Sequence, residues 1–212
     1  IDLLRSESEQ HAEFNSRLTY MSFKKDEDKI DSKQYNNNMV NEFKHLSIYN
    51  DEIITFLVAG VAIETELEFI AHTEATVARL TSSKTKAQFE PLYKIITFNQ
   101  DEESIKNQKE IIKDYILLKE RHIKKYHNYL KDASSMEIFN VNTIGSKAVS
   151  FTITMSLKNW HKTLIGRLSY QGVEIDMLET MEIIATQLQK KYPLLIKSVP
   201  EYYKMNNGKK YE

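Results

Sequence analysis

Two short runs of the sequence carry side chains that can bind a phosphate or a cofactor. The first is His45-Leu46-Ser47, which precedes an apolar segment and offers an imidazole and a hydroxyl. The second runs from Ala71 to Ser83 and contains His72. Its hydroxyl groups belong to Thr73, Thr76, Thr81, Ser82 and Ser83. Backbone N–H groups at such a place can hold a phosphate. The alternatives are structural: a polar helix end for the first run, and a Thr/Ser-rich cap and turn for the second.

A third group of polar residues lies nearer the C-terminal end. It comprises Trp160-His161, Arg167, Gln171 and Glu174. Its alternative interpretation is a core tryptophan with a hydrogen-bonded neighbour. Two further histidines, His122 and His127, are five residues apart, a helical rotation of about 500°, so they do not share a face as paired metal ligands would. The sequence also has no glycine-rich phosphate loop and no serine-hydrolase motif, and we expect no metal site.

Composition limits the class of protein. The chain has 212 residues, of which 41% are hydrophobic and 28% charged, as in a globular domain. The absence of cysteine excludes disulfides, thiolate metal sites and a cysteine nucleophile. A net charge of -1 predicts neither nucleic acid nor an anionic membrane as a partner. No apolar run reaches the roughly 20 residues of a membrane span. We therefore expect a cytoplasmic protein, located in the host cytoplasm if a phage encodes it.

The elements that must position these groups follow from periodicity. Sparse glycine and proline predict one domain over 1–212, with a polar surface loop at 24–38 and a frayed tail at 206–212. Strands are expected at Ile53–Val61 and Val149–Leu157, where β-branched and aromatic residues gather. Helices or helical turns are expected at Ala12–Phe23, Met39–Phe43, Ala62–Leu80, Glu102–Leu130, Lys158–Leu168 and Glu174–Lys191. The fold class is α/β or α+β, with each strand followed by a helix.

Taken in order, these groups resemble the flavin-dependent thymidylate synthases, the ThyX family, over most of the chain. Ser16-Arg17-Leu18-Thr19-Tyr20 is similar to that family's AARVSY segment. His45-Leu46-Ser47, followed by Ile54-Thr55-Phe56, is similar to its HxSxxEHxxFTF segment. Phe151 to Ile175 is similar in layout to its TxNxRxLxHFLxLRxxxxAQxEIR region, with Glu174-Ile175 on the EI.

The family's signature, RHRxxSxNExSxRY, is largely replaced. Laid on Ala71 to Lys84, it keeps His72, and Thr76 and Thr81 retain hydroxyls at the serine positions. The remaining signature positions hold Ala71, Thr73, Ala78, Arg79, Ser83 and Lys84. Because guanidinium contacts to phosphate contribute about 1.5–3 kcal/mol each, their loss weakens nucleotide binding unless lysines compensate. The chain has only five arginines in total.

The resemblance implies a fold, a reaction and a set of site residues. The fold would be a central, mostly antiparallel sheet flanked by long helices. The reaction would be reductive methylation of dUMP to dTMP with FAD, NADPH and methylenetetrahydrofolate, in a site formed between subunits of a homotetramer. The flavin would lie near His72, Thr73, His45 and Ser47. The nucleotide would lie near Thr81, Ser83 and Arg167, with the Thr81 hydroxyl orienting it for catalysis.

Two other hypotheses remain open. In one, the chain keeps the ThyX-like scaffold as a homo-oligomer without the reaction, and binds a nucleotide or a protein partner. Arg79 favours this hypothesis, because it reverses the charge of the signature glutamate. In the other, the resemblance is accidental and the chain is an unrelated scaffold.

Overall fold

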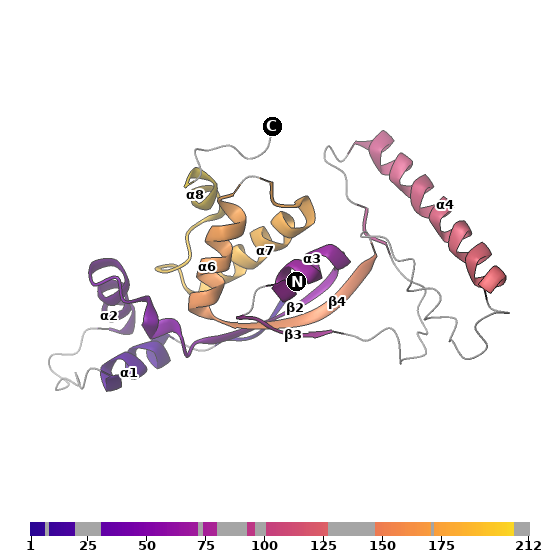
Figure 1. Cartoon of the computed structure of the whole chain (residues 1–212). Coiled ribbons are helices and arrows are strands. Elements are labelled where there is room, and N and C mark those ends of the chain that lie inside the picture. Colours follow the sequence, from indigo (N-terminus) through magenta and orange to yellow (C-terminus); the bar gives the residue numbers. More distant parts are fainter. Residues whose placement is uncertain are drawn as a thin grey trace. The chain divides into compact units, whose positions relative to one another are not determined.

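The computed structural model shows a mixed α+β protein built on one four-stranded antiparallel sheet (Figure 1). It describes residues 1–6, 9–19, 31–71, 74–79, 93–95, 101–126, 147–170 and 172–205. The strands are β1 (Asp2–Arg5), β2 (Ile53–Ala62), β3 (Thr76–Arg79) and β4 (Ala148–Ser156). Their order in the sheet is β1-β2-β4-β3, so the two long strands are central neighbours.

Seven α-helices are found in the described ranges. They are α1 (Glu9–Thr19), α2 (Ser32–Asn37), α3 (Ile63–Ala71), α4 (Glu102–Tyr126), α6 (Leu157–Leu168), α7 (Ile175–Lys191) and α8 (Val199–Lys204). A π-helix, η2 (Asn38–Glu42), and a 3-10 helix, η3 (Leu46–Tyr49), lie between α2 and β2. None of the described helices combines the length and the apolar character that crossing a bilayer requires.

Each central strand continues directly into a helix, as the sequence predicts. β2 leads into α3 and β4 leads into α6 without an intervening loop (Figure 1). Near the first of these junctions Gly60 has φ +75°, a left-handed conformation that favours glycine. The predicted strands at 53–61 and 149–157, and the predicted helices at 158–168 and 174–191, are confirmed to within one residue.

Two sequence expectations are wrong in part. The helix predicted over Ala62–Leu80 ends at Ala71, and Thr76–Arg79 forms the edge strand β3, because an edge partner in the sheet outweighs local helix propensity. The surface loop predicted at 24–38 contains α2 and the start of η2. The carboxylate of Asp31 caps α2 by accepting hydrogen bonds from the backbone N–H groups of Lys33 and Gln34, at 2.8 and 3.0 Å.

Other expectations are only partly covered by the described residues. Helices are confirmed within the predicted ranges 12–23 and 102–130, as α1 and α4, but residues 20–23 and 127–130 lie outside the described residues. So does the tail at 206–212. The strand β1 and the helix α8 were not predicted from the sequence. A capping box starts α8, in which the Glu201 carboxylate accepts a hydrogen bond from the backbone N–H of Ser198 at 2.9 Å.

The chain divides into two compact units. Unit 1 comprises Ile1–Val58, His72–Val77 and Thr152–Glu212, and unit 2 comprises Ala59–Ala71 and Ala78–Phe151. The boundary passes through the residues of β2, β3 and β4. The expectation of one domain over 1–212 stays a prediction.

The core of unit 1 is built around Trp160. Its indole is fully buried, lies edge-on to Phe56 with the ring centres 5.2 Å apart, and donates a hydrogen bond to the backbone oxygen of Ile54 at 3.3 Å. Helix α7 packs against α6 and buries Met181, Ile184 and Leu188. Burying this apolar surface is the main force that holds the helices to the sheet.

In unit 2, helix α3 is held by an aromatic contact and by a backbone hydrogen bond. Phe69 of α3 and Phe151 of β4 are buried, with their rings 5.7 Å apart. The backbone N–H of Ile63, the first residue of α3, donates to the oxygen of Lys147 at 2.9 Å.

Trp160→Ala is expected to lower the free energy of unfolding by about 3–5 kcal/mol, because it leaves a large cavity. Urea unfolding followed by far-UV circular dichroism measures this change. Lys162→Ala, on the same helix, is the control, since Lys162 is highly exposed and its only described ion pair, to Glu74, spans 3.8 Å. The control should change stability by about 0.5 kcal/mol or less, and equal effects of both substitutions would contradict the assigned core.

Burial of the Tyr202 hydroxyl makes stability depend on alkaline pH. Burial raises the pKa of Tyr202 from 10.0 to about 12, with a smaller contribution from Glu201. The stability that the Tyr202 hydroxyl contributes is complete below pH 10 and is lost as the pH rises towards 12. Between these pH values the hydroxyl ionises readily in the unfolded chain but not in the folded one. At pH 11 we expect a loss on the order of 1 kcal/mol relative to pH 9. Tyr202→Phe should show a correspondingly flatter profile in urea unfolding, and identical slopes would contradict the burial.

Candidate functional site

The predicted cofactor residues His45 and Ser47 lie at the start of η3, just before β2. Both side chains are exposed. His45 is the N-terminal flanking residue of η3, and its backbone N–H donates to the oxygen of Met39 at 2.8 Å. Lys44, immediately before it, has φ +57° and is exposed. This segment therefore presents an imidazole, a hydroxyl and an ammonium group at the surface of unit 1.

The predicted nucleotide residue Arg167 lies in the last turn of α6 and is half-buried. A cation is favourable there, because the helix dipole is negative at its C-terminal end. The first residue of α6, Leu157, donates its N–H to the oxygen of Glu52, three residues after η3, at 2.7 Å. Helix α6 also contacts η3. Arg167 is ten residues after Leu157, about 15 Å along the axis.

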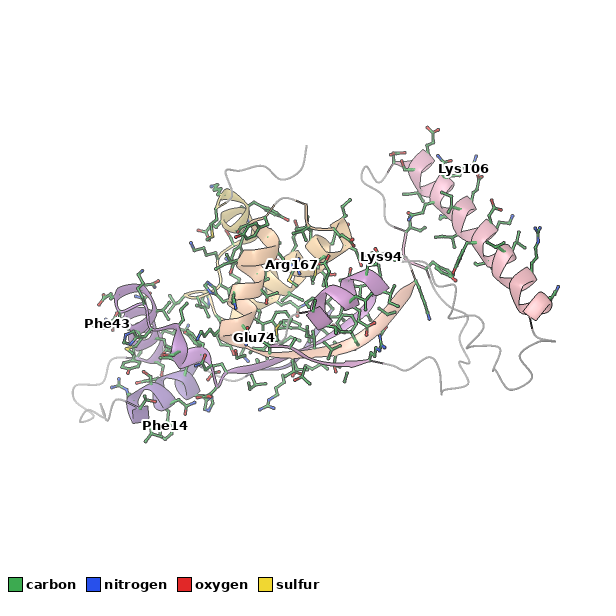
Figure 2. All side chains as sticks on the ribbon, viewed as in Figure 1. Phe14, Phe43, Glu74, Lys94, Lys106 and Arg167 are labelled. Carbon is green, nitrogen blue, oxygen red and sulfur yellow. The ribbon has the colours of Figure 1, made fainter. Side chains whose placement is uncertain are left out.

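Within a single copy of the chain, Arg167 therefore lies far along α6 from the end of that helix that contacts Glu52. Figure 2 labels Phe43, two residues before His45, well apart from Arg167. The other predicted site residues, His72, Thr73, Thr81 and Ser83, lie outside the described residues. Thr76, also noted in the sequence, is described and is exposed on β3.

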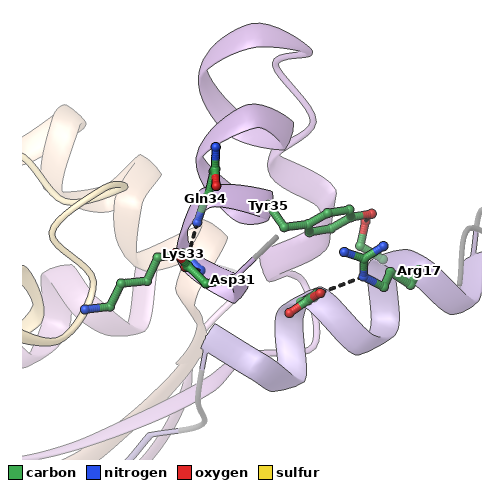
Figure 3. Close-up of polar contacts among 7 residues, drawn as sticks. Arg17, Asp31, Lys33, Gln34 and Tyr35 are labelled. Carbon is green, nitrogen blue, oxygen red and sulfur yellow. Dashed lines mark hydrogen bonds and ion pairs between the residues drawn. The ribbon is translucent and has the colours of Figure 1, made fainter. Parts of the chain in front are cut away.

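Arg17, which belongs to the segment similar to AARVSY, has a structural role. Its Nε donates to the Glu13 carboxylate at 2.6 Å, and its guanidinium lies 4.1 Å from the ring centre of Tyr35 (Figure 3). The hydroxyl of Tyr35 is 3.0 Å from that of Ser16. This cation–π contact and ion pair hold α1 against α2, and they bury the guanidinium almost completely.

Arg79, which reverses the charge of the signature glutamate, pairs with a carboxylate of its own unit. Its Nη1 is 3.4 Å from Oε2 of Glu66 on α3. Glu66 is only 1% exposed, and its Oε1 has no hydrogen-bond partner among the described residues. Burial lowers the pKa of Lys147, and the negative charge of Glu66 partly offsets that effect. Arg79 is thus committed to neutralising a buried charge.

A second buried carboxylate, that of Glu52, pairs with His11 and was not predicted from the sequence. Their Oε1 and Nδ1 atoms are 2.6 Å apart, and Nε2 of His11 is 3.2 Å from the amide nitrogen of Asn15. Because an ionised carboxylate only accepts hydrogen bonds, Nδ1 is the protonated nitrogen and Nε2 accepts from Asn15. Both ring nitrogens are thus used to anchor α1 to the residue that precedes β2. A histidine four residues before an asparagine was the available signal, but it does not identify the distant carboxylate.

The described residues fit a flavin dinucleotide only in part. A pyrophosphate is best held by several charge-assisted contacts. His45, Ser47 and Lys44 supply polar groups of the right kind, whereas Arg17 and Arg79 are already paired with carboxylates. No cluster of three or more potential metal ligands occurs in the described ranges.

The Arg79–Glu66 pair gives a test of the charge assignment. Arg79→Ala should lower the free energy of unfolding by about 1–3 kcal/mol, because it leaves a buried carboxylate without its cation. Adding Glu66→Gln to that variant should recover part of the loss, since the amide carries no charge. A double-mutant cycle by urea unfolding measures the coupling. Lys124→Ala, an exposed substitution on α4, is the control, and additive effects of the two changes would rule out the pairing.

Comparison with known proteins leaves the family membership of this chain open, since no protein-family model and no curated protein matches it.

Proposed function

We propose that this chain is a divergent flavin-dependent thymidylate synthase of the ThyX type, which binds FAD and dUMP. The observation that best supports the proposal is the neighbouring position of β2 and β4. These strands carry parts of two of the segments that resemble the family, and each strand continues into a helix. The hydroxyls of Thr55 and Thr154 on these strands are 2.9 Å apart. A likeness in sequence order is thus matched by adjacency in the fold.

The site residues keep the roles that the resemblance implies. His45 and Ser47, with His72 and Thr73, would hold the flavin, while Arg167, Thr81 and Ser83 would hold dUMP. Bound FAD would accept electrons from NADPH and pass them on in the methylation that uses methylenetetrahydrofolate. Because Arg167 lies about 15 Å along α6 from the start of that helix, a site containing both His45 and Arg167 would draw on two copies of the chain. A homotetramer would provide that arrangement.

A second candidate is a ThyX-like homo-oligomer that binds a nucleotide or a protein partner without catalysing the reaction. The pairing of Arg79 with Glu66 favours it, as does the burial of Arg17 against Glu13. An arginine that is paired with a carboxylate of the same chain contributes little to binding a phosphate, because the carboxylate already neutralises its positive charge.

Titration of the purified chain with FAD and dUMP, separately and together, tests both candidates. A ligand at 100 times its dissociation constant stabilises the fold by about 2.7 kcal/mol, which raises the melting temperature by roughly 2–4 °C or more. We expect FAD fluorescence to saturate and dUMP to alter that binding. His45→Ala with Ser47→Ala should weaken FAD binding, and Arg167→Ala should weaken dUMP binding selectively.

The outcomes separate the two candidates. FAD and dUMP binding followed by formation of dTMP from methylenetetrahydrofolate and NADPH would support the synthase. Binding of either ligand without turnover would support the non-catalytic nucleotide-binding protein. No response to either ligand at millimolar concentration would overturn the synthase and leave a scaffold for a protein partner.

A further inference from the structure

Helix α4 exposes two large apolar side chains on one face. Ile111 is 64% exposed and Leu118 is 57% exposed. They are seven residues apart, so they lie within about 20° of each other around the helix and about 10 Å apart along it. The adjoining face, with Ile105, Ile112 and Ile116, is half-buried. Tyr115, at the border between the two faces, contacts Tyr93 of the same unit, with the ring centres 6.1 Å apart.

The charges on α4 and the residue before it are divided between its two ends. Residues 101–114 contain five acidic and three basic side chains, a net charge of -2. Residues 115–126 contain four basic side chains and one acidic side chain, a net charge of +3 with histidine neutral. Two such helices side by side attract each other when antiparallel and repel when parallel. Their helix dipoles act in the same sense.

We propose that α4 is an interaction surface for a second copy of this chain, paired antiparallel about a two-fold axis near residues 114 and 115. The midpoint between Ile111 and Leu118 nearly coincides with the midpoint of the helix, Glu102–Tyr126. The axis therefore places Ile111 of each copy against the partner's Leu118. Such an interface is isologous and closes at two copies. The inference does not depend on the proposed function.

The same register brings opposite charges together along one edge of the surface. Glu110 and Arg121 are eleven residues apart, three helical turns, so they lie on the same flank. In a two-fold antiparallel pair, each flank faces its own counterpart, and Glu110 then faces the partner's Arg121. The two-fold axis forms this ion pair twice.

One like-charge contact accompanies this arrangement. Asp114 lies on the same flank as Glu110, next to the axis, so it approaches the partner's Asp114. Asp114→Asn removes this repulsion and is therefore expected to strengthen the pairing, by roughly 2- to 5-fold in the dissociation constant. Weaker pairing of that variant would contradict the position of the axis.

Disulfide cross-linking tests the register directly, because the chain has no cysteine of its own. Chains carrying I111C and chains carrying L118C are mixed and oxidised, and each is also oxidised alone. We expect a disulfide-linked dimer only in the mixture. Within the proposed pair, Cα atoms of identical positions are about 10 Å apart along the axis, beyond the roughly 7 Å that a disulfide spans. Cross-linking of either chain alone would indicate parallel pairing and overturn the proposal. So would the absence of cross-linking in the mixture.

A charge exchange tests the ion pairs independently of the apolar contact. Arg121→Glu should weaken self-association by roughly 3- to 30-fold in sedimentation velocity. The double variant Glu110→Arg with Arg121→Glu should restore it, because the exchange recreates both pairs across the axis. If the double variant associates more weakly than Arg121→Glu alone, the proposed contact is wrong.

Leu118→Glu tests the apolar contact, with Leu117→Glu as the matched control. Leu117 is also exposed on α4, at 43%, but it points about 120° away from Ile111. Leu118→Glu should weaken pairing by roughly 100-fold or more, while Leu117→Glu leaves it unchanged. Equal effects would overturn the assigned face. Far-UV circular dichroism checks that helicity is retained in both variants.

Discussion

The antiparallel register of β2 and β4 is the constraint on which the rest of the structure depends. Each strand ends where its neighbour begins, so the helix that follows each strand starts beside the first residues of the other. Two hydrogen bonds follow this pattern: the N–H of Leu157 donates to the oxygen of Glu52, and the N–H of Ile63 donates to the oxygen of Lys147. In each, the first residue of a helix donates to the residue just before the other strand. A backbone N–H at the first turn of a helix has no partner within that helix. The neighbouring strand supplies that partner, and thereby fixes where α3 and α6 start.

The sequence predicted the parts of the fold that depend on local pattern. The two central strands are runs of β-branched and aromatic residues, and α7 repeats apolar residues at helical spacing until Pro193, so both are visible without tertiary information. The four-residue strand β3 is too short for a periodic pattern and exists because it pairs at a sheet edge. Helix α2 lies in a polar run, and its main local signal is the cap at Asp31.

Prediction of the candidate site reached a similar limit. The exposed positions of His45 and Ser47 follow from a polar segment that precedes a strand. The charge reversal at Arg79 is visible in the sequence, but its compensation is not. Arg79 forms its ion pair with Glu66, which lies thirteen residues earlier in the sequence and on another element. Glu66 belongs to α3 and Arg79 to β3, and no helical or strand period predicts a contact between the two elements.

Buried carboxylates determine how this chain uses its cationic groups. Glu52 and Glu66 are both almost fully inaccessible to solvent, and an unpaired charge in such a place is strongly unfavourable. Arg79 offsets that cost at Glu66 with its charge, and His11 offsets it at Glu52 with a hydrogen bond from Nδ1. Each contact thereby links one element to another. Arginine is scarce in this sequence, so each guanidinium used in this way is unavailable to a phosphate. An anionic ligand must therefore be held by other groups, such as Arg167, lysines, hydroxyl groups or a second copy of the chain.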